Sequence, residues 1–122
     1  MSVQKIGFVG FRSQDLAALR RVFEEGLGMT PTAAVEGQVR YDLADGTRLE
    51  GYSQDNEFHR FFTTGPVVGF AVEDFEESWT RLTRIGIEGL TEVQQEDGQK
   101  WVHFRLPDGT VAELIGGARP AG

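Results

Sequence analysis

Few side chains of this 122-residue chain could carry out catalysis or hold a metal ion. There is no cysteine, which excludes a thiolate nucleophile, a disulfide and a Cys-ligated metal. The two histidines are His59 and His103. The sequence has no nucleophile elbow, phosphate-binding glycine loop or HExxH motif. The candidate chemistry is therefore left to two imidazoles and to carboxylates.

Two of the carboxylates, Glu50 and Glu113, lie at the same position of a repeated phrase. YDLADGTRLEGY begins at Tyr41, and FRLPDGTVAELI begins at Phe104. A second repeated phrase is FVGFRSQDL at residues 8–16, which is similar to VVGFAVEDF at residues 67–75. The chain thus contains two copies of one module of about 55 residues, a tandem duplication rather than a solenoid repeat.

Each module is predicted to run strand, helix and then three strands. The first strand alternates over residues 5–12, and the other strands are expected at 30–35, 38–43, 47–53, 88–94, 100–106 and 110–116. The Asp-Gly pairs at 45–46 and 108–109 predict hairpin turns. We expect one domain over residues 1–122, with modules at about 5–53 and 66–116 and a connection at 54–65.

The helices are predicted from apolar spacing and capping signals. In the second helix, Asp74 can cap and Glu77 sits at the capping-box position. The expected buried stripes are Leu16, Leu19, Phe23 and Leu27 in the first helix, and Phe75, Trp79, Leu82 and Ile85 in the second.

Charge and hydropathy exclude two classes of partner. The net charge is −7, and no run of Lys or Arg offers the basic face that nucleic acid requires. No apolar run approaches a membrane span, and the N-terminus does not read as a leader. The expectation is a soluble cytoplasmic protein without nucleic-acid or membrane partners.

The repeated βαβββ pattern, with VGF(x)2(Q/E)D and DGT(x)2E in both halves, resembles the vicinal oxygen chelate superfamily. That superfamily contains glyoxalase I, extradiol dioxygenases, fosfomycin-resistance enzymes and bleomycin-resistance proteins. The resemblance covers residues 6–116 and implies an α+β fold. In that fold two tandem βαβββ modules form a curled mixed-sheet cup, with the helices outside and the site inside.

The resemblance also implies four metal-ligand positions, typically His, Glu, His and Glu, on the first and last strands of the modules. Here these positions hold Phe8, Glu50, Val67 and Glu113. Two carboxylates without imidazole make a poor site for Zn, Ni or Fe(II). We therefore expect no metal and no other cofactor.

Strand parity then predicts which side chains face the cup. The expected ligand-binding residues are Phe8, Arg40, Glu50, Tyr52, Trp101, His103 and Glu113. Aromatic walls with a few polar groups suit a planar or amphipathic small molecule. No residue is assigned a catalytic role.

Several alternatives stay open for these residues. His103 could join Glu50 and Glu113 in an atypical metal site. The two carboxylates could raise each other's pKa for acid–base work, or they could be neutralised by Arg40 or Arg48. Trp101 could line the ligand site or pack on a second subunit.

The connection between the modules has its own alternatives. His59 could be a surface or loop-packing residue, or it could reach the ligand. Phe58, Phe61 and Phe62 could form an interface or cover the edge of a pocket.

The function predicted from the sequence is metal-independent binding of a small molecule, such as an antibiotic, by a homodimer of the bleomycin-resistance type. The rival is an enzyme of the same superfamily, a lyase, isomerase or dioxygenase. It would use an atypical metal site or Glu acid–base chemistry. A third possibility is a domain whose role is protein association.

Overall fold

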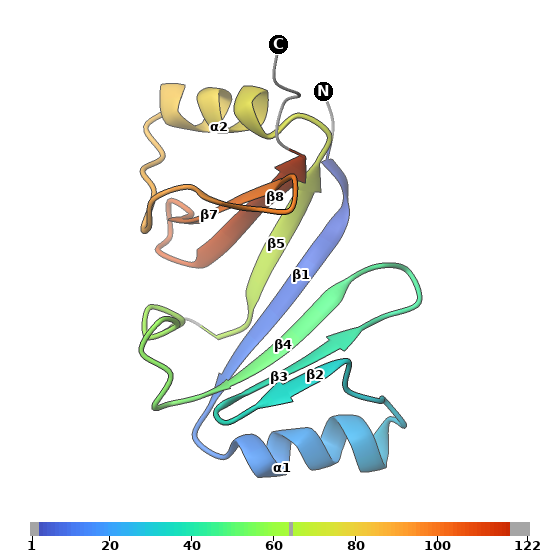
Figure 1. Cartoon of the computed structure of the whole chain (residues 1–122). Coiled ribbons are helices and arrows are strands. Elements are labelled where there is room, and N and C mark those ends of the chain that lie inside the picture. The colour runs from blue at the N-terminus through green and yellow to red at the C-terminus, as the bar shows by residue number, and fades with distance from the viewer. Residues whose placement is uncertain (1–2, 64, 118–122) are drawn as a thin grey trace. The chain divides into compact units, whose positions relative to one another are not determined.

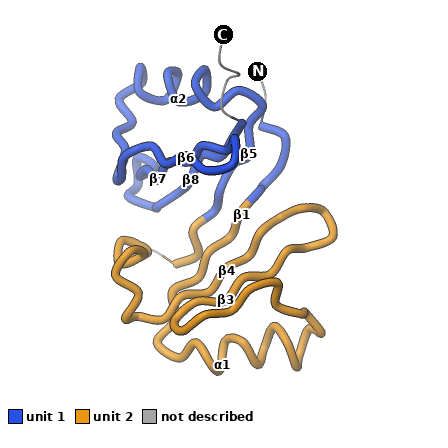
Figure 2. The backbone as a smooth tube through the Cα atoms, viewed as in Figure 1, with its two compact units in different colours: residues 1–7, 68–122 blue, residues 8–67 orange. Residues whose placement is uncertain are grey.

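The computed structural model describes residues 3–63 and 65–117, which form two compact units (Figure 2). Unit 2 comprises residues 8–67. Unit 1 comprises residues 68–122 together with residues 1–7. The strand β1 (Val3–Ser13) contributes to both units. The boundary therefore falls within this strand, which the sequence pattern places wholly in the first module.

Unit 2 continues from β1 through a helix and three strands. The helix α1 (Leu16–Arg21) runs on into a π-helical turn (Val22–Gly26). The strands β2 (Ala33–Val35), β3 (Gln38–Asp42) and β4 (Arg48–Ser53) follow, in the spatial order β2-β3-β4-β1. β4 pairs parallel with β1, and the other pairs are antiparallel.

Unit 1 repeats this arrangement with β5 (Val67–Val72), α2 (Phe75–Arg84), β6 (Gln94–Glu96), β7 (Gln99–Arg105) and β8 (Val111–Gly117) (Figure 1). Its order is β5-β8-β7-β6, with β5 parallel to β8 and the other pairs antiparallel. The predicted α+β class, with two βαβββ modules and mixed sheets, is confirmed.

The repeated DGT phrase makes the same turn in both units. Asp45 Oδ1 accepts a hydrogen bond from the Thr47 amide, and Asp108 Oδ1 accepts one from the Thr110 amide. The intervening Gly46 and Gly109 have φ of 87° and 92°, a region that favours glycine. Local sequence therefore determines both hairpins, and these hairpins set the register of the strands that carry Glu50 and Glu113.

Each unit buries apolar side chains between its helix and one face of its strands. In unit 2 this core contains Phe23, Val39 and Tyr41, with Phe11, Leu16, Leu19, Met29 and Leu49 packed around them. In unit 1 it contains Val72, Phe75, Val102, Phe104, Ala112 and Leu114, with Phe70, Trp79, Leu82, Ile87 and Leu106 around them. The predicted parity of the strands is correct in both units.

For each helix, the prediction that the last residue of the apolar stripe is buried is wrong. Leu27 is 67% exposed and Ile85 is 78% exposed. The π-helical turn shifts the helical phase before Leu27, so Met29 reaches the core instead. Ile85 follows the end of α2, where the backbone has left the helix.

The strand predicted at residues 88–94 is also wrong, because β6 begins only at Gln94. Gly89 forms an isolated bridge to Phe104, and a side chain there would lie 2.8 Å from the Thr91 carbonyl oxygen. The pairing of β6 with β7 instead depends on a tight turn at Asp97 and Gly98, both with positive φ. This third Asp-Gly pair of the chain is visible in the sequence, and its turn sets where β6 pairs with β7.

Candidate functional site

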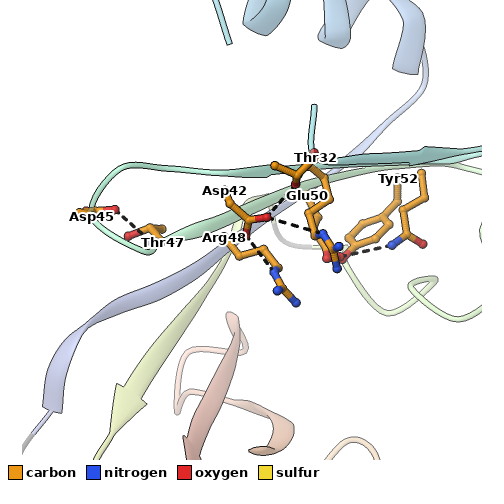
Figure 3. Close-up of polar contacts among 9 residues, drawn as sticks. Thr32, Asp42, Asp45, Thr47, Arg48, Glu50 and Tyr52 are labelled. Atoms are coloured by element: carbon orange, nitrogen blue, oxygen red, sulfur yellow. Dashed lines mark hydrogen bonds and ion pairs between the residues drawn. The ribbon is translucent and has the colours of Figure 1, made fainter. Parts of the chain in front are cut away.

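The strand face opposite α1 carries a ladder of polar side chains on β3 and β4 (Figure 3). The directly opposed pairs are Gln38 with Tyr52, Arg40 with Glu50, and Asp42 with Arg48. Side chains at alternate positions of a strand share a face, so all six project to the side away from α1. This is the face that parity predicts for Arg40, Glu50 and Tyr52.

Glu50 is held by neutral donors on its own sheet. The Tyr52 hydroxyl donates a hydrogen bond of 2.6 Å to Oε1 of Glu50, and Nε2 of Gln38 donates a longer one of 3.4 Å to the same oxygen. Glu50 is 9% exposed and Tyr52 is 1% exposed. Burial of a carboxylate is costly without such bonds, so Tyr52 and Gln38 make the buried position of Glu50 possible.

The two arginines of the ladder pair with Asp42 and not with Glu50. Nε of Arg48 lies 3.4 Å from one Asp42 oxygen, and Nε of Arg40 lies 3.9 Å from the other. The Thr32 hydroxyl donates a 2.7 Å bond to Asp42, and this bond, with the two arginines, lowers the pKa of that carboxyl. Both ion pairs of Arg40 and Arg48 in the described residues are therefore with Asp42, although Arg40 lies opposite Glu50 in the strand register.

An aromatic group covers the Tyr52 end of this face. The His59 imidazole stacks on the Tyr52 ring, with centroids 3.5 Å apart and planes inclined by 13°. Phe62 meets the edges of both rings, at 5.5 Å from Tyr52 and 5.0 Å from His59. The connecting segment therefore covers part of the site face, and His59 is a packing residue within it.

Phe8 belongs to the same group. A Cβ at Gly10 would lie 2.8 Å from the rings of both Phe8 and Phe62, so the two rings close over this glycine. Phe8 is 6% exposed. The first of the four superfamily ligand positions is thus filled by a packed benzyl group.

In unit 1, His103 and Glu113 face each other on β7 and β8, on the side away from α2. Nε2 of His103 lies 2.9 Å from Oε2 of Glu113, an ion pair when the imidazole is protonated. The residues are 3% and 5% exposed. Trp101 lies on the same face of β7, opposite Ile115, and is partly buried.

The structure brings the predicted residues together in two sets, Phe8, Arg40, Glu50 and Tyr52 in unit 2 and Trp101, His103 and Glu113 in unit 1. Val67, at the third superfamily ligand position, is fully buried. Across residues 3–63 and 65–117, no group of three His, Asp or Glu side chains is placed to hold a metal ion. Glu50 belongs to unit 2 and His103 and Glu113 belong to unit 1, so the atypical site of these three residues stays a prediction.

Sequence reasoning missed Arg12 and Asn56. Nη2 of Arg12 donates a 2.8 Å hydrogen bond to the Gln54 carbonyl, and Nη1 donates a 3.1 Å bond to the Arg60 carbonyl. Asn56 Oδ1 accepts from the His59 amide at 3.1 Å. Arg12 could have been found from the alternation of side chains along β1, which places it on the same face as Phe8 and Gly10.

In the described part of the chain, no helix is long and apolar enough to cross a membrane.

No protein-family model matches the sequence, and no curated protein does. Solved structures do match in three dimensions. A hypothetical protein, BH1468 from Bacillus halodurans C-125, has a TM-score of 0.70 at 12% identity, with 97% of each chain covered. A glyoxalase/bleomycin resistance protein/dioxygenase superfamily member from Vibrio splendidus 12B01 has a TM-score of 0.69 at 19% identity, covering 92% of this chain and 97% of that one.

Methylmalonyl-CoA epimerase from Mycobacterium tuberculosis has a TM-score of 0.68 at 18% identity, covering 96% of this chain and 90% of that one. The chain therefore has the vicinal oxygen chelate fold, the fold of the glyoxalase/bleomycin resistance protein/dioxygenase superfamily. This confirms the resemblance inferred from the repeated phrases at the level of the fold. A fold that hosts many chemistries does not by itself decide the function.

Proposed function

We propose that the protein binds a small molecule without a metal ion, in the manner of a bleomycin-resistance protein. The residues proposed for ligand binding are Phe8, Arg40, Glu50 and Tyr52 on the strand face opposite the helix of unit 2, and Trp101, His103 and Glu113 on the corresponding face of unit 1. The protein acts as a cytoplasmic homodimer that sequesters its ligand, for example an antibiotic.

The observation that carries this proposal is the state of the four superfamily ligand positions. Phe8 and Val67 have no donor atom, and both are buried. The Glu50 carboxylate accepts from Tyr52, and the Glu113 carboxylate contacts His103. Each carboxylate is therefore already engaged by a neighbour in its own unit.

Residue chemistry on the two faces favours a planar or amphipathic ligand. The partly exposed Trp101 offers aromatic surface, Tyr52 is a second aromatic ring that lies beneath His59, and the carboxylates favour hydrogen-bond donors over anions. Removing a planar ligand from water onto such surfaces supplies affinity, while the polar groups fix its orientation.

The experiment that tests the proposal is a binding screen with a panel of planar antibiotics and dyes, read by quenching of tryptophan fluorescence. Each titration is run with and without a strong chelator. Equal affinity in both conditions, with unchanged ligand recovered afterwards, supports the proposal. Loss of binding in the chelator, or chemical conversion of the ligand, contradicts it.

A second function, acid–base isomerisation, is favoured by one observation, the buried contact of His103 with Glu113. A carboxylate and an imidazole side by side can exchange a proton with a substrate carbon acid. A solved structure with this fold is methylmalonyl-CoA epimerase, so branched acyl-CoA thioesters are the substrates to test. Deuterium incorporation from heavy water, lost in His103→Gln, would establish this activity, and no incorporation would reject it.

A further inference from the structure

The strand face that carries Tyr52 is covered by the chain's own segment of residues 54–62. Arg12 grips this segment at two points, through the carbonyl groups of Gln54 and Arg60. A guanidinium presents its donors in a rigid fork, so one side chain fixes both places at once. The segment is therefore held as a strap by a residue of β1.

The strap also inserts a ring beside β1. The rings of Phe62 and Phe8 close over Gly10, where any Cβ would lie 2.8 Å from both. Phe8, Gly10 and Arg12 alternate along β1 and so share one face. The whole of that face, from Phe8 to Arg12, thus serves to receive the strap.

His59 is the strap residue placed on Tyr52. Its Nδ1 lies 2.9 Å from Oδ1 of Asn56, and an amide oxygen can only accept, so Nδ1 carries the proton. The imidazole is thereby held flat against the phenol at 3.5 Å, while Phe62 closes the edge. The Tyr52 hydroxyl points to the Glu50 carboxylate at the rim of this stack.

The imidazole is a nitrogen heterocycle that stacks face to face on Tyr52 and meets the edge of Phe62. A planar heteroaromatic ligand would bind Tyr52 in the same arrangement. We propose that His59 occupies the ligand's own stacking position. A planar heteroaromatic molecule with a ring N–H binds by replacing the imidazole on Tyr52. This inference rests on the proposed small-molecule binding, and it specifies the chemical class of the ligand and where it stacks.

Competition between the His59 imidazole and the ligand lowers the apparent affinity for the ligand. While His59 lies on Tyr52, only the fraction of molecules with the strap displaced can take up the ligand, so the apparent affinity is reduced by that fraction. Deleting the imidazole removes the competitor. The affinity of His59→Ala should then exceed that of the wild type by about tenfold, the order of one aromatic stack.

The test uses benzimidazole as the probe and cyclohexanol as a non-aromatic control. Binding to the whole protein is followed by NMR of the His59 and Tyr52 ring signals. We expect benzimidazole, and not cyclohexanol, to move the His59 signals of the wild type toward their unstacked positions. His59→Ala should bind benzimidazole about tenfold more tightly.

The matched control is Phe58→Ala, which removes a half-exposed ring of the same strap that contacts His59 and Phe61. Its affinity should stay within about twofold of the wild type, because the imidazole remains on Tyr52. Thermal melting checks that each variant is folded. If His59→Ala does not fold, Arg12→Lys, which loses the fork, serves instead. It should show faster amide exchange over residues 54–62 and tighter benzimidazole binding.

The outcomes separate the inference from the proposed function. If panel ligands or benzimidazole bind without moving the His59 signals, or bind His59→Ala no more tightly than wild type, the inference is wrong and small-molecule binding stands. If neither benzimidazole nor any member of the panel binds either protein, both are wrong.

Discussion

His103 and Glu113 stand directly opposite each other on neighbouring strands, with Nε2 of the imidazole 2.9 Å from Oε2 of the carboxylate. Both side chains are almost wholly buried. A carboxylate in that position depends on its neighbour, since no buried charge is stable without a compensating group. The contact is therefore the buried polar interaction on this strand face of unit 1, and the Tyr52–Glu50 hydrogen bond is its counterpart in unit 2.

Replacing His103 with alanine should destabilise the protein by about 1–3 kcal/mol, the cost of leaving a buried acceptor without its neighbour. Urea unfolding at neutral pH measures the change. The double variant with Glu113→Gln should recover part of the loss, because an amide needs less compensation than a carboxylate. A double variant that is less stable by the sum of the single losses would contradict a direct coupling.

Metal analysis should find no stoichiometric transition metal in protein purified without a chelator. Two of the four superfamily ligand positions have no donor atom, and Glu50 and Glu113 are engaged by neighbours. Elemental analysis is the measurement. About one Zn, Ni, Fe or Mn per chain, lost in Glu113→Ala, would overturn this expectation.

The two tryptophans should separate binding from stability. Trp101 lies on the face away from the helix, so Trp101→Ala should weaken binding of a planar ligand by about 1–3 kcal/mol with little change in unfolding. Trp79 packs on the unit 1 core, with its ring 6.2 Å from that of Phe104. Trp79→Ala should instead cost about 3 kcal/mol of stability.

Paired measurements of fluorescence titration and urea unfolding on both variants decide this point. Wild-type affinity in Trp101→Ala for a ligand that the native protein binds would show that the ligand lies elsewhere.

Tyr41 should make the stability fall in strong base. Burial, and then its hydrogen bond to Glu24, raise the pKa of Tyr41 from 10.0 to about 12. The folded state thus favours the neutral phenol. This contribution is complete below pH 10 and is lost as the pH rises from about 10 to about 12. Unfolding in urea across this window should show the decline, and the decline should be shallower in Tyr41→Phe.

We expect a homodimer, and we expect substitutions in the edge strand β2 of unit 2 to weaken it. Phe62 and His59 pack on their own unit, whereas Val35 at the end of β2 is 70% exposed. An unprotected edge strand with apolar side chains tends to pair with another chain. Light scattering should give twice the chain mass of 13.5 kDa, and Val35→Asp should lower it toward the monomer. A monomer mass for the wild type across the micromolar range would exclude the dimer.

The amino-acid sequence determined the repeated βαβββ modules, the Asp-Gly turns and the face of each strand on which a residue lies. These features depend on periodicity and on single turn residues, which are local properties. Alternation alone put Glu50 and Tyr52 on one face and Val39 and Tyr41 on the other.

Only the tertiary structure decided which partner each side chain takes. Arg40 and Arg48 lie on the face that carries both Asp42 and Glu50, and their ion pairs are with Asp42, which also accepts the Thr32 bond. The hydrogen bonds of Arg12 to the strap join residues far apart in the chain, and the stack of His59 on Tyr52 depends on how the strap folds back over β4. No periodicity records such contacts, because they form only when several elements have already packed and each donor meets its competing acceptors.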